Sequence, residues 1–238
     1  MKVHLMLTCL ADAFAGRVGI ATTEILERLG CQVLFSPAQT CCGQPLFNTG
    51  AWDKARELNE SYWRAIVGDA DPAIPMVSPS ASCAAMMRHG AKMIGGPACP
   101  ARVYELAEFL VQRLKMTDWP GPGFPDGRRI VFHPACHTRM LGTTGLQEQI
   151  LDLIPGLDWT QARDAEQCCG FGGAFSIELP AISAEIGHEK LRTVGETGRP
   201  EFVTGDLGCL LHLQGLAAKS GSDMRFTHFV ELLREALG

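Results

Sequence analysis

The chain has 238 residues, of which 46% are hydrophobic and 20% charged, and its formal net charge is -5. This composition is typical of a globular protein with one large or two small domains. The negative charge and the lack of a Lys and Arg cluster argue against nucleic-acid binding. No apolar stretch is long enough for a membrane span and no convincing export signal begins the chain, so we expect a cytoplasmic protein.

The first half of the chain alternates short β-type runs with amphipathic helical runs. Residues 3–7 predict a strand, and Val18, Thr22, Ile25 and Leu29 follow at helical spacing. Residues 32–35 predict a second strand, and residues 76 and 77 lie in a third. This order indicates βαβ units, in which a parallel sheet is covered by helices.

A segment rich in proline and glycine separates the two halves. Residues 117–129, TDWPGPGFPDGRR, contain three prolines and three glycines, which disfavour both helix and strand. We therefore predict a domain boundary here, with one domain at residues 1–118 and a second at residues 119–238.

The second half repeats the order of the first. Residues 129–132 predict a strand, Leu146, Ile150 and Leu153 fall at helical spacing, residues 159–162 predict another strand, and a helix is expected from about 179 to 193. The predicted fold class is therefore α/β, with two tandem duplicated βαβ-type domains.

The cysteines follow the same duplication. An offset of 127 relates three cysteines of the first half to three of the second, and an offset of 126 relates a fourth pair. The repeated residues are Cys9, Cys41, Cys42 and Cys83, followed by Cys136, Cys168, Cys169 and Cys209. Each set follows the ends of successive predicted strands, which meet at one edge of a parallel sheet. We therefore expect two sites of four thiols each.

Four convergent thiolates suit zinc or an iron–sulfur cluster, because both prefer soft sulfur ligands. Adjacent cysteines are awkward ligands for a single tetrahedral ion but can reach different irons of a cluster, which favours the cluster. Cys31 and Cys99 have no counterpart in the other half. We expect core or incidental roles for these two.

The spacing of Cys9, Cys41-Cys42-Gly43 and Cys83, with its repeat, resembles the CCG, or cysteine-rich, domains of heterodisulfide reductases and of the glycolate oxidase iron–sulfur subunit. The chain more closely resembles the small CCG subunits of three-subunit lactate-oxidising complexes. This resemblance rests on the segments CLADAF, ERLGCQV, AQTCCGQP, SPSASC, YELAEFL and CCGFGG. Both resemblances cover essentially the whole chain.

The closer resemblance implies an iron–sulfur electron-transfer subunit of a complex that oxidises L-lactate to pyruvate. It implies one cluster per domain, of the [4Fe-4S] type, held by the eight repeated cysteines. The partners it implies are the other iron–sulfur subunits of such a complex, the LutB-like and LutC-like proteins. No GxGxxG dinucleotide fingerprint follows a predicted strand, so the chain alone is not expected to oxidise lactate.

Two alternatives remain open at this point. Domains of the heterodisulfide reductase type usually end in Cys-x-x-Cys, and here the last position holds Met86 or His212. A related thiol-disulfide reductase is one alternative, although the fifth cysteine is missing. The other is a module held by zinc, in one or both sites.

Several other side chains near the cysteines can also interact with a metal centre. His133 and His137 bracket Cys136, and His212 is a candidate ligand, whereas Met86 is expected to pack in the core. For Asp206, capping of a helix is favoured over proton transfer.

Overall fold

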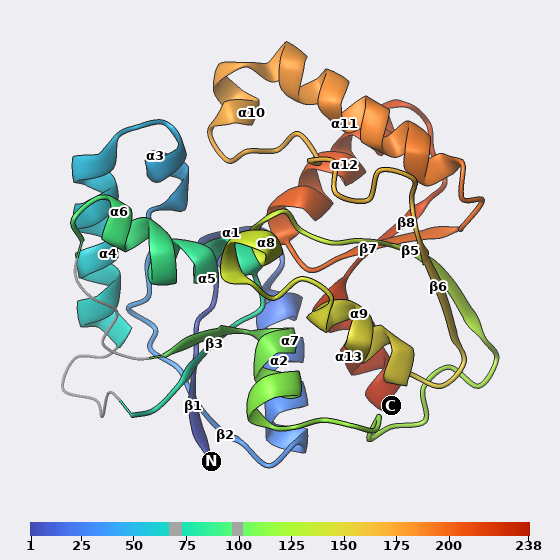
Figure 1. Ribbon diagram of the computed structural model, residues 1–238, viewed down its shortest axis with the longest axis horizontal. Helices are drawn as coiled ribbons and strands as arrows, with labels where there is room; N and C mark the ends of the chain where they lie inside the picture. The colour runs from blue at the N-terminus through green and yellow to red at the C-terminus, as the bar shows by residue number, and fades with distance from the viewer. Residues whose placement is uncertain (67–72, 97–101) are drawn as a thin grey trace.

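The computed structural model describes residues 1–66, 73–96 and 102–238. Its strands form two four-stranded parallel sheets, in the orders β2-β1-β3-β4 and β6-β5-β7-β8, each with helices packed against it (Figure 1). The predicted α/β class with parallel sheets is confirmed. Each sheet and its helices are called here the first and the second domain.

The first domain contains four strands and nine helical segments within the described residues. In chain order they are β1 (Lys2–Leu5), α1 (Cys9–Phe14), α2 (Gly16–Arg28), β2 (Gln32–Leu34), α3 (Gln44–Asn48), α4 (Trp52–Ile66), β3 (Met76–Ser78), α5 (Ala81–Ala85), the π-helix η1 (Met86–Gly90), α6 (Ala91–Met93), β4 (Val103–Glu105), α7 (Leu106–Glu108) and the π-helix η2 (Phe109–Arg113).

The second domain repeats this order with longer strands. Its elements are β5 (Arg128–His133), α8 (His137–Leu141), α9 (Leu146–Leu153), β6 (Leu157–Gln161), α10 (Phe175–Glu178), α11 (Pro180–Gly195), β7 (Glu201–Thr204), α12 (Leu207–Lys219), β8 (Arg225–His228) and α13 (Phe229–Leu237). Within the part of the chain that the structure describes, no helix has the length and apolar character that a membrane crossing needs.

The first strand is shorter than the sequence predicts. It ends at Leu5 rather than at residue 7, because the chain turns to begin α1 directly afterwards. The hydroxyl of Thr8 accepts a hydrogen bond from the backbone N–H of Ala11 at 3.2 Å and so caps this helix. Cys9 therefore begins a helix instead of closing a strand.

The two domains pack against each other through reciprocal pairs of helices. Helix α13 of the second domain packs on α2 of the first, and α7 of the first domain packs on α9 of the second. Closer to the cysteines, α5 of the first domain packs on α8 of the second, and α1 of the first domain packs on α12 of the second. One hydrophobic core therefore runs through both domains, with Phe109 and Phe132 among its fully buried side chains.

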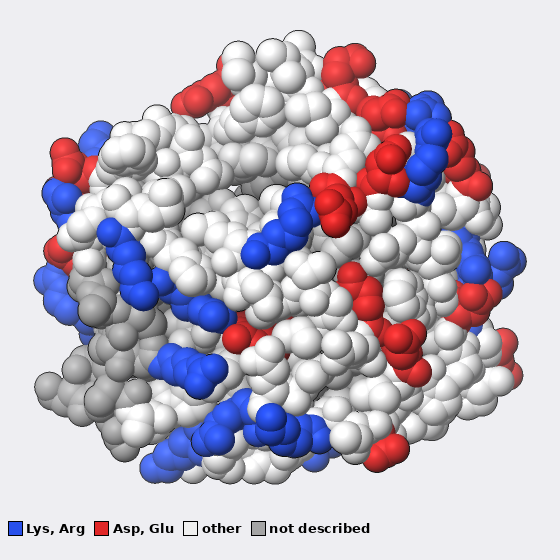
Figure 2. All heavy atoms as spheres, viewed as in Figure 1, with Lys and Arg blue, Asp and Glu red and all other residues white. Residues whose placement is uncertain are grey.

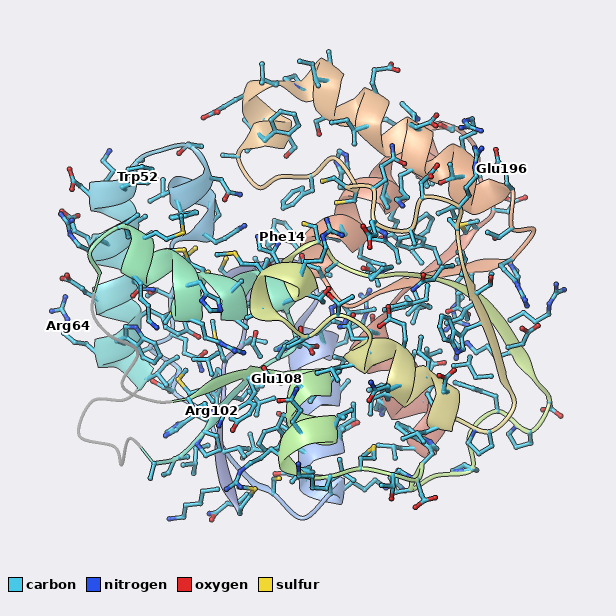
Figure 3. The ribbon with its side chains drawn as sticks, in the orientation of Figure 1. Phe14, Trp52, Arg64, Arg102, Glu108 and Glu196 are labelled. Atoms are coloured by element: carbon cyan, nitrogen blue, oxygen red, sulfur yellow. The ribbon has the colours of Figure 1, made fainter. Side chains whose placement is uncertain are left out.

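Glu105 is a buried carboxylate in this interface, with 1% of its surface exposed. It accepts hydrogen bonds from the backbone N–H groups of Ala107 at 2.9 Å and Glu108 at 3.2 Å, and from the amide of Gln147 in the other domain at 3.1 Å. Glu108, labelled in Figure 3, pairs with Arg88 at 2.8 Å. Burial raises the pKa of Glu105 from its ordinary value of 4.5 to about 7, although the hydrogen bonds oppose it.

We expect Glu105 to make the protein less stable as the pH rises from 4.5 to 7. The folded state binds a proton that the unfolded state has released in this window, so the contribution is favourable below pH 4.5 and lost above pH 7. The loss is about 3 kcal/mol. Glu105→Gln keeps the cap and offers an N–H to the Oε1 atom of Gln147, which has no partner among the described residues.

Urea unfolding of the wild type and of Glu105→Gln at about pH 5 and pH 8 measures this effect. The variant is expected to gain stability relative to the wild type at the higher pH. Glu24→Gln, at an exposed carboxylate that pairs with Arg234, is the matched control. An equal pH dependence in all three proteins would contradict the prediction.

Candidate metal centres

The first set of cysteines gathers where three strands of the first sheet end. Cys9 begins α1 after β1, Cys41 and Cys42 lie in the loop after β2, and Cys83 is the third residue of α5 after β3. The sulfur atoms of Cys9 and Cys41 are 3.7 Å apart, and Cys42 contacts both Cys41 and Cys83. Residues far apart in sequence thus present four thiols to one place.

The second set has the same arrangement. Cys136 directly precedes α8 after β5, Cys168 and Cys169 follow β6, and Cys209 is the third residue of α12 after β7. The sulfur atoms of Cys169 and Cys209 are 2.9 Å apart, and Cys168 contacts both Cys136 and Cys169. All nine cysteines that the structure describes have free thiols.

Each set stabilises one thiolate. A hydrogen bond from Cys42, and a second from Cys9, lower the pKa of Cys41 to about 3. In the second set, hydrogen bonds from Cys136 and Cys169 lower the pKa of Cys168 to about 2. The same hydrogen bonds, together with burial, raise the pKa of the thiols of Cys9 and Cys42. Further ionisation at these sites requires a cation, because several thiolates cannot share this space unneutralised. The donor set therefore fits a thiophilic metal centre.

The glycine after each cysteine pair has a structural reason. Gly43 and Gly170 both have a φ of +92°, which side chains rarely tolerate. A Cβ atom would lie 2.7 Å from the carbonyl oxygen of Ala55 at Gly43, and 2.5 Å from that of Ser183 at Gly170. Each glycine N–H also donates to the sulfur two residues earlier, at 3.4 and 3.3 Å. The CCG triplet is thus a tight turn that supports its own thiolate.

Both cysteine sets border one cavity of about 420 Å³ between the two domains. The lining includes Cys9, Cys42 and Cys83 of the first set and all four cysteines of the second. No Lys or Arg belongs to it within the described residues. Figure 2 shows the surface hollowed between the lobes that carry α3 and α10, in a region with few charged side chains.

Asp206 joins the two sites across the domain interface. Its carboxylate accepts hydrogen bonds from the hydroxyl of Ser80 at 2.9 Å, the backbone N–H of Ser82 at 3.2 Å and that of Gly208 at 3.1 Å. The bond from Gly208 confirms the predicted helix cap, here on α12. The other two bonds reach the start of α5, which carries Cys83. One buried carboxylate therefore orients a cysteine helix in each domain.

The other residues that the sequence suggested as possible ligands occupy different surroundings in the structure. Nε2 of His212 lies 3.3 Å from the carbonyl oxygen of Ser183, and Met86 is buried in the core as expected. His137 lies near Cys136, with Nδ1 3.6 Å from its sulfur. Cys31 is buried in the core, and Cys99 lies outside the described residues.

His133 lies near two other cysteines of the second set. A ring nitrogen of His133 and the sulfur atoms of Cys169 and Cys209 all lie within 4.8 Å of one another. Burial lowers the pKa of His133 to about 3, so its ring is neutral. The sequence placed this histidine only beside Cys136, because its distance from Cys169 depends on how β5 and β6 pair.

Comparisons with known proteins agree with this geometry. A family model described as "Cysteine-rich domain", CCG, matches residues 3–88 and 130–214. Proteins named "Lactate utilization protein A" from Geobacillus kaustophilus (strain HTA426) and Oceanobacillus iheyensis are 40% and 38% identical to the chain, covering 98% of it and 98% and 96% of their own lengths. A crystal structure of a hypothetical protein from Helicobacter pylori shares the fold, with a TM-score of 0.62, at 10% identity over all of this chain and 49% of that one.

Proposed function

The chain belongs to the CCG family of cysteine-rich domains, and from this premise we propose that it is an iron–sulfur electron-transfer subunit of a complex that oxidises L-lactate to pyruvate. The name "Lactate utilization protein A", carried by relatives that match over nearly the full length, supports the substrate. The two convergent sets of four thiols carry the redox part of the proposal.

We propose one [4Fe-4S] cluster in each domain, held by Cys9, Cys41, Cys42 and Cys83 in the first and by Cys136, Cys168, Cys169 and Cys209 in the second. Within each adjacent pair the two sulfurs face different partners: Cys41 contacts Cys9, and Cys42 contacts Cys83. Such divergence suits a centre with several metal atoms better than a single zinc ion. When bound, the clusters supply one-electron redox chemistry.

The residues of this chain hold and insulate the redox centres rather than bind lactate. The N–H groups of Gly43 and Gly170 donate to sulfur, which tunes a cluster potential, and the cavity sets the cysteines back from the outer surface between the two domains. A carboxylate substrate is usually bound by an Arg or Lys side chain, and neither residue type occurs in the described lining of the cavity. The lactate site therefore belongs to a partner subunit in our proposal.

The proposed partners are the other iron–sulfur subunits of the complex, and the proposed location is the cytoplasm. Free thiols throughout the described chain suit a reducing compartment. A thiol-disulfide reductase is a second candidate, and the cavity shared by both cysteine sets favours it. The four cysteines per set, without a fifth, favour the electron-transfer role.

Deleting the gene for this chain is expected to abolish growth on L-lactate and to leave growth on pyruvate unchanged, because only the oxidation step is lost. Growth curves of the deletion strain on each carbon source test this. Complementation with the wild-type gene should restore growth on lactate. Undiminished growth on lactate, in a strain without another lactate-oxidising enzyme, would remove the functional proposal.

A further inference from the structure

Lys190 is a buried cation beside the loop that carries the second cysteine pair. It lies on α11 and is 0% exposed. Its ammonium donates to the backbone carbonyl of Asp164 at 2.8 Å and to that of Ala165 at 3.3 Å. Both acceptors are neutral, and the carboxylate of Asp164 pairs with Arg163 instead, at 3.8 Å. A buried charge without a charged partner is unfavourable, so this position requires a nearby anion.

The face of α11 that carries Lys190 covers the second cysteine pair. Ser183, Gly187 and Lys190 are spaced four and three residues apart, so they lie on one face of the helix. The Ser183 hydroxyl donates to the carbonyl of Gly170 at 2.8 Å. A Cβ atom added at Gly187 would lie 3.3 Å from the carbonyl oxygen of Cys169. The helix therefore contacts this loop both before and after its two cysteines, and the ammonium lies on the side before them.

Cysteine sulfurs are among the anionic groups that stabilise this ammonium. Burial lowers the pKa of Lys190, and the negative charges of Asp164, Cys169 and Cys168 oppose that shift. The side chain of Asp164 is 61% exposed, so water screens its charge. A cluster with four thiolate ligands carries net negative charge. A cluster in the second site therefore supplies the anion that this buried cation lacks.

The first domain has a neutral side chain at the equivalent position. The CCG glycine of the first domain, Gly43, packs on the carbonyl of Ala55, and that of the second domain packs on the carbonyl of Ser183. Helices α4 and α11 therefore correspond at an offset of 128 residues, which relates Tyr62 to Lys190. Tyr62 is 1% exposed, and burial raises the pKa of its hydroxyl, so the phenol is neutral. A cation at this position thus distinguishes the second site from the first.

We propose that Lys190 tunes the second cluster: its buried ammonium raises the reduction potential of that centre above the value that the cysteines alone would give. This inference rests on the clusters of the proposed function. Reduction adds one negative charge to a cluster, and a fixed cation nearby in a low-dielectric interior stabilises the reduced form more than the oxidised form. Lys190 therefore helps to hold an electron on the second centre during transfer.

The test is a redox titration of the full-length protein, purified anaerobically and followed by electron paramagnetic resonance, with iron and sulfide measured on the same samples. Lys190→Gln keeps an N–H donor for the loop carbonyls but removes the charge, whereas Lys190→Arg keeps both. Lys190→Gln is expected to shift the midpoint potential of one centre downward, and Lys190→Arg should retain the potential of the wild type. Lys219→Gln, at an exposed lysine that ends α12, is the matched control and should leave both potentials unchanged.

Variants with a single cluster assign the shift to its centre. Lys190→Gln should lower the potential in the Cys42→Ser chain, which keeps the second cluster, and leave it unchanged in the Cys169→Ser chain, which keeps the first. A full complement of iron and sulfide in Lys190→Gln, with both potentials equal to those of the wild type, would overturn the inference and leave the clusters in place.

Two further outcomes separate a role of the charge from a role in folding and from the cofactor itself. Loss of the second cluster from Lys190→Arg as well as from Lys190→Gln would show that Lys190 only supports the loop, and would overturn the tuning role. Absence of iron and sulfide from the wild type would overturn the proposed function, and this inference with it.

Discussion

Replacing Cys42 with serine is expected to remove about half of the iron and sulfide from the anaerobically purified protein, because each cysteine set holds its own cluster. Cys42 is buried between Cys41 and Cys83, and a serine hydroxyl is a much poorer donor to iron than a thiolate. Cys169→Ser should cause a loss of the same size from the second domain. Iron and sulfide analysis, with electron paramagnetic resonance of the reduced protein, measures both losses.

The matched control for these variants is Cys31→Ser, because Cys31 is also buried but directly precedes β2, at the opposite end of this strand from Cys41 and Cys42. Its metal content is expected to equal that of the wild type. The double variant with both Cys42→Ser and Cys169→Ser should contain almost no iron. If either single variant lost all of its iron, the two sets would share one centre, and the assignment of one cluster to each domain would be wrong.

The purified, cluster-replete chain is expected to show no turnover of L-lactate with an artificial electron acceptor, and turnover should appear once its partner subunits are added. Lactate oxidation removes two electrons, and the proposed clusters carry one each, so a site that takes both from the substrate must lie elsewhere. The cavity between the cysteine sets also has no Lys or Arg in its described lining to bind the lactate carboxylate.

Acceptor reduction by the chain alone, by the partners alone and by the assembled complex measures this requirement. The Cys42→Ser chain, added to the partners, should fail to restore full turnover, whereas the Cys31→Ser chain should restore it. Robust lactate oxidation by this chain without partners would place the substrate site on it.

The sequence predicted the repeated fold because its signals are local. The alternation of β-type and amphipathic runs indicated parallel sheets, and the helix expected near Leu146, Ile150 and Leu153 is α9 (Leu146–Leu153). The ends of elements were less accurate, because capping decides them. Thr8 begins α1 early and shortens β1, and Cys83 and Cys209 lie inside helices rather than in loops.

The sequence by itself determined which cysteines are duplicated and that each set converges, since matching strand ends meet at the same edge of a parallel sheet. Only the tertiary structure decided that the two sets face one cavity, because this depends on how α5 packs on α8 and α1 on α12. It also placed His133, and not His212, within 4.8 Å of Cys169 and Cys209. Sequence spacing measures distance along the chain, whereas a metal centre depends on distances between elements that only packing brings together.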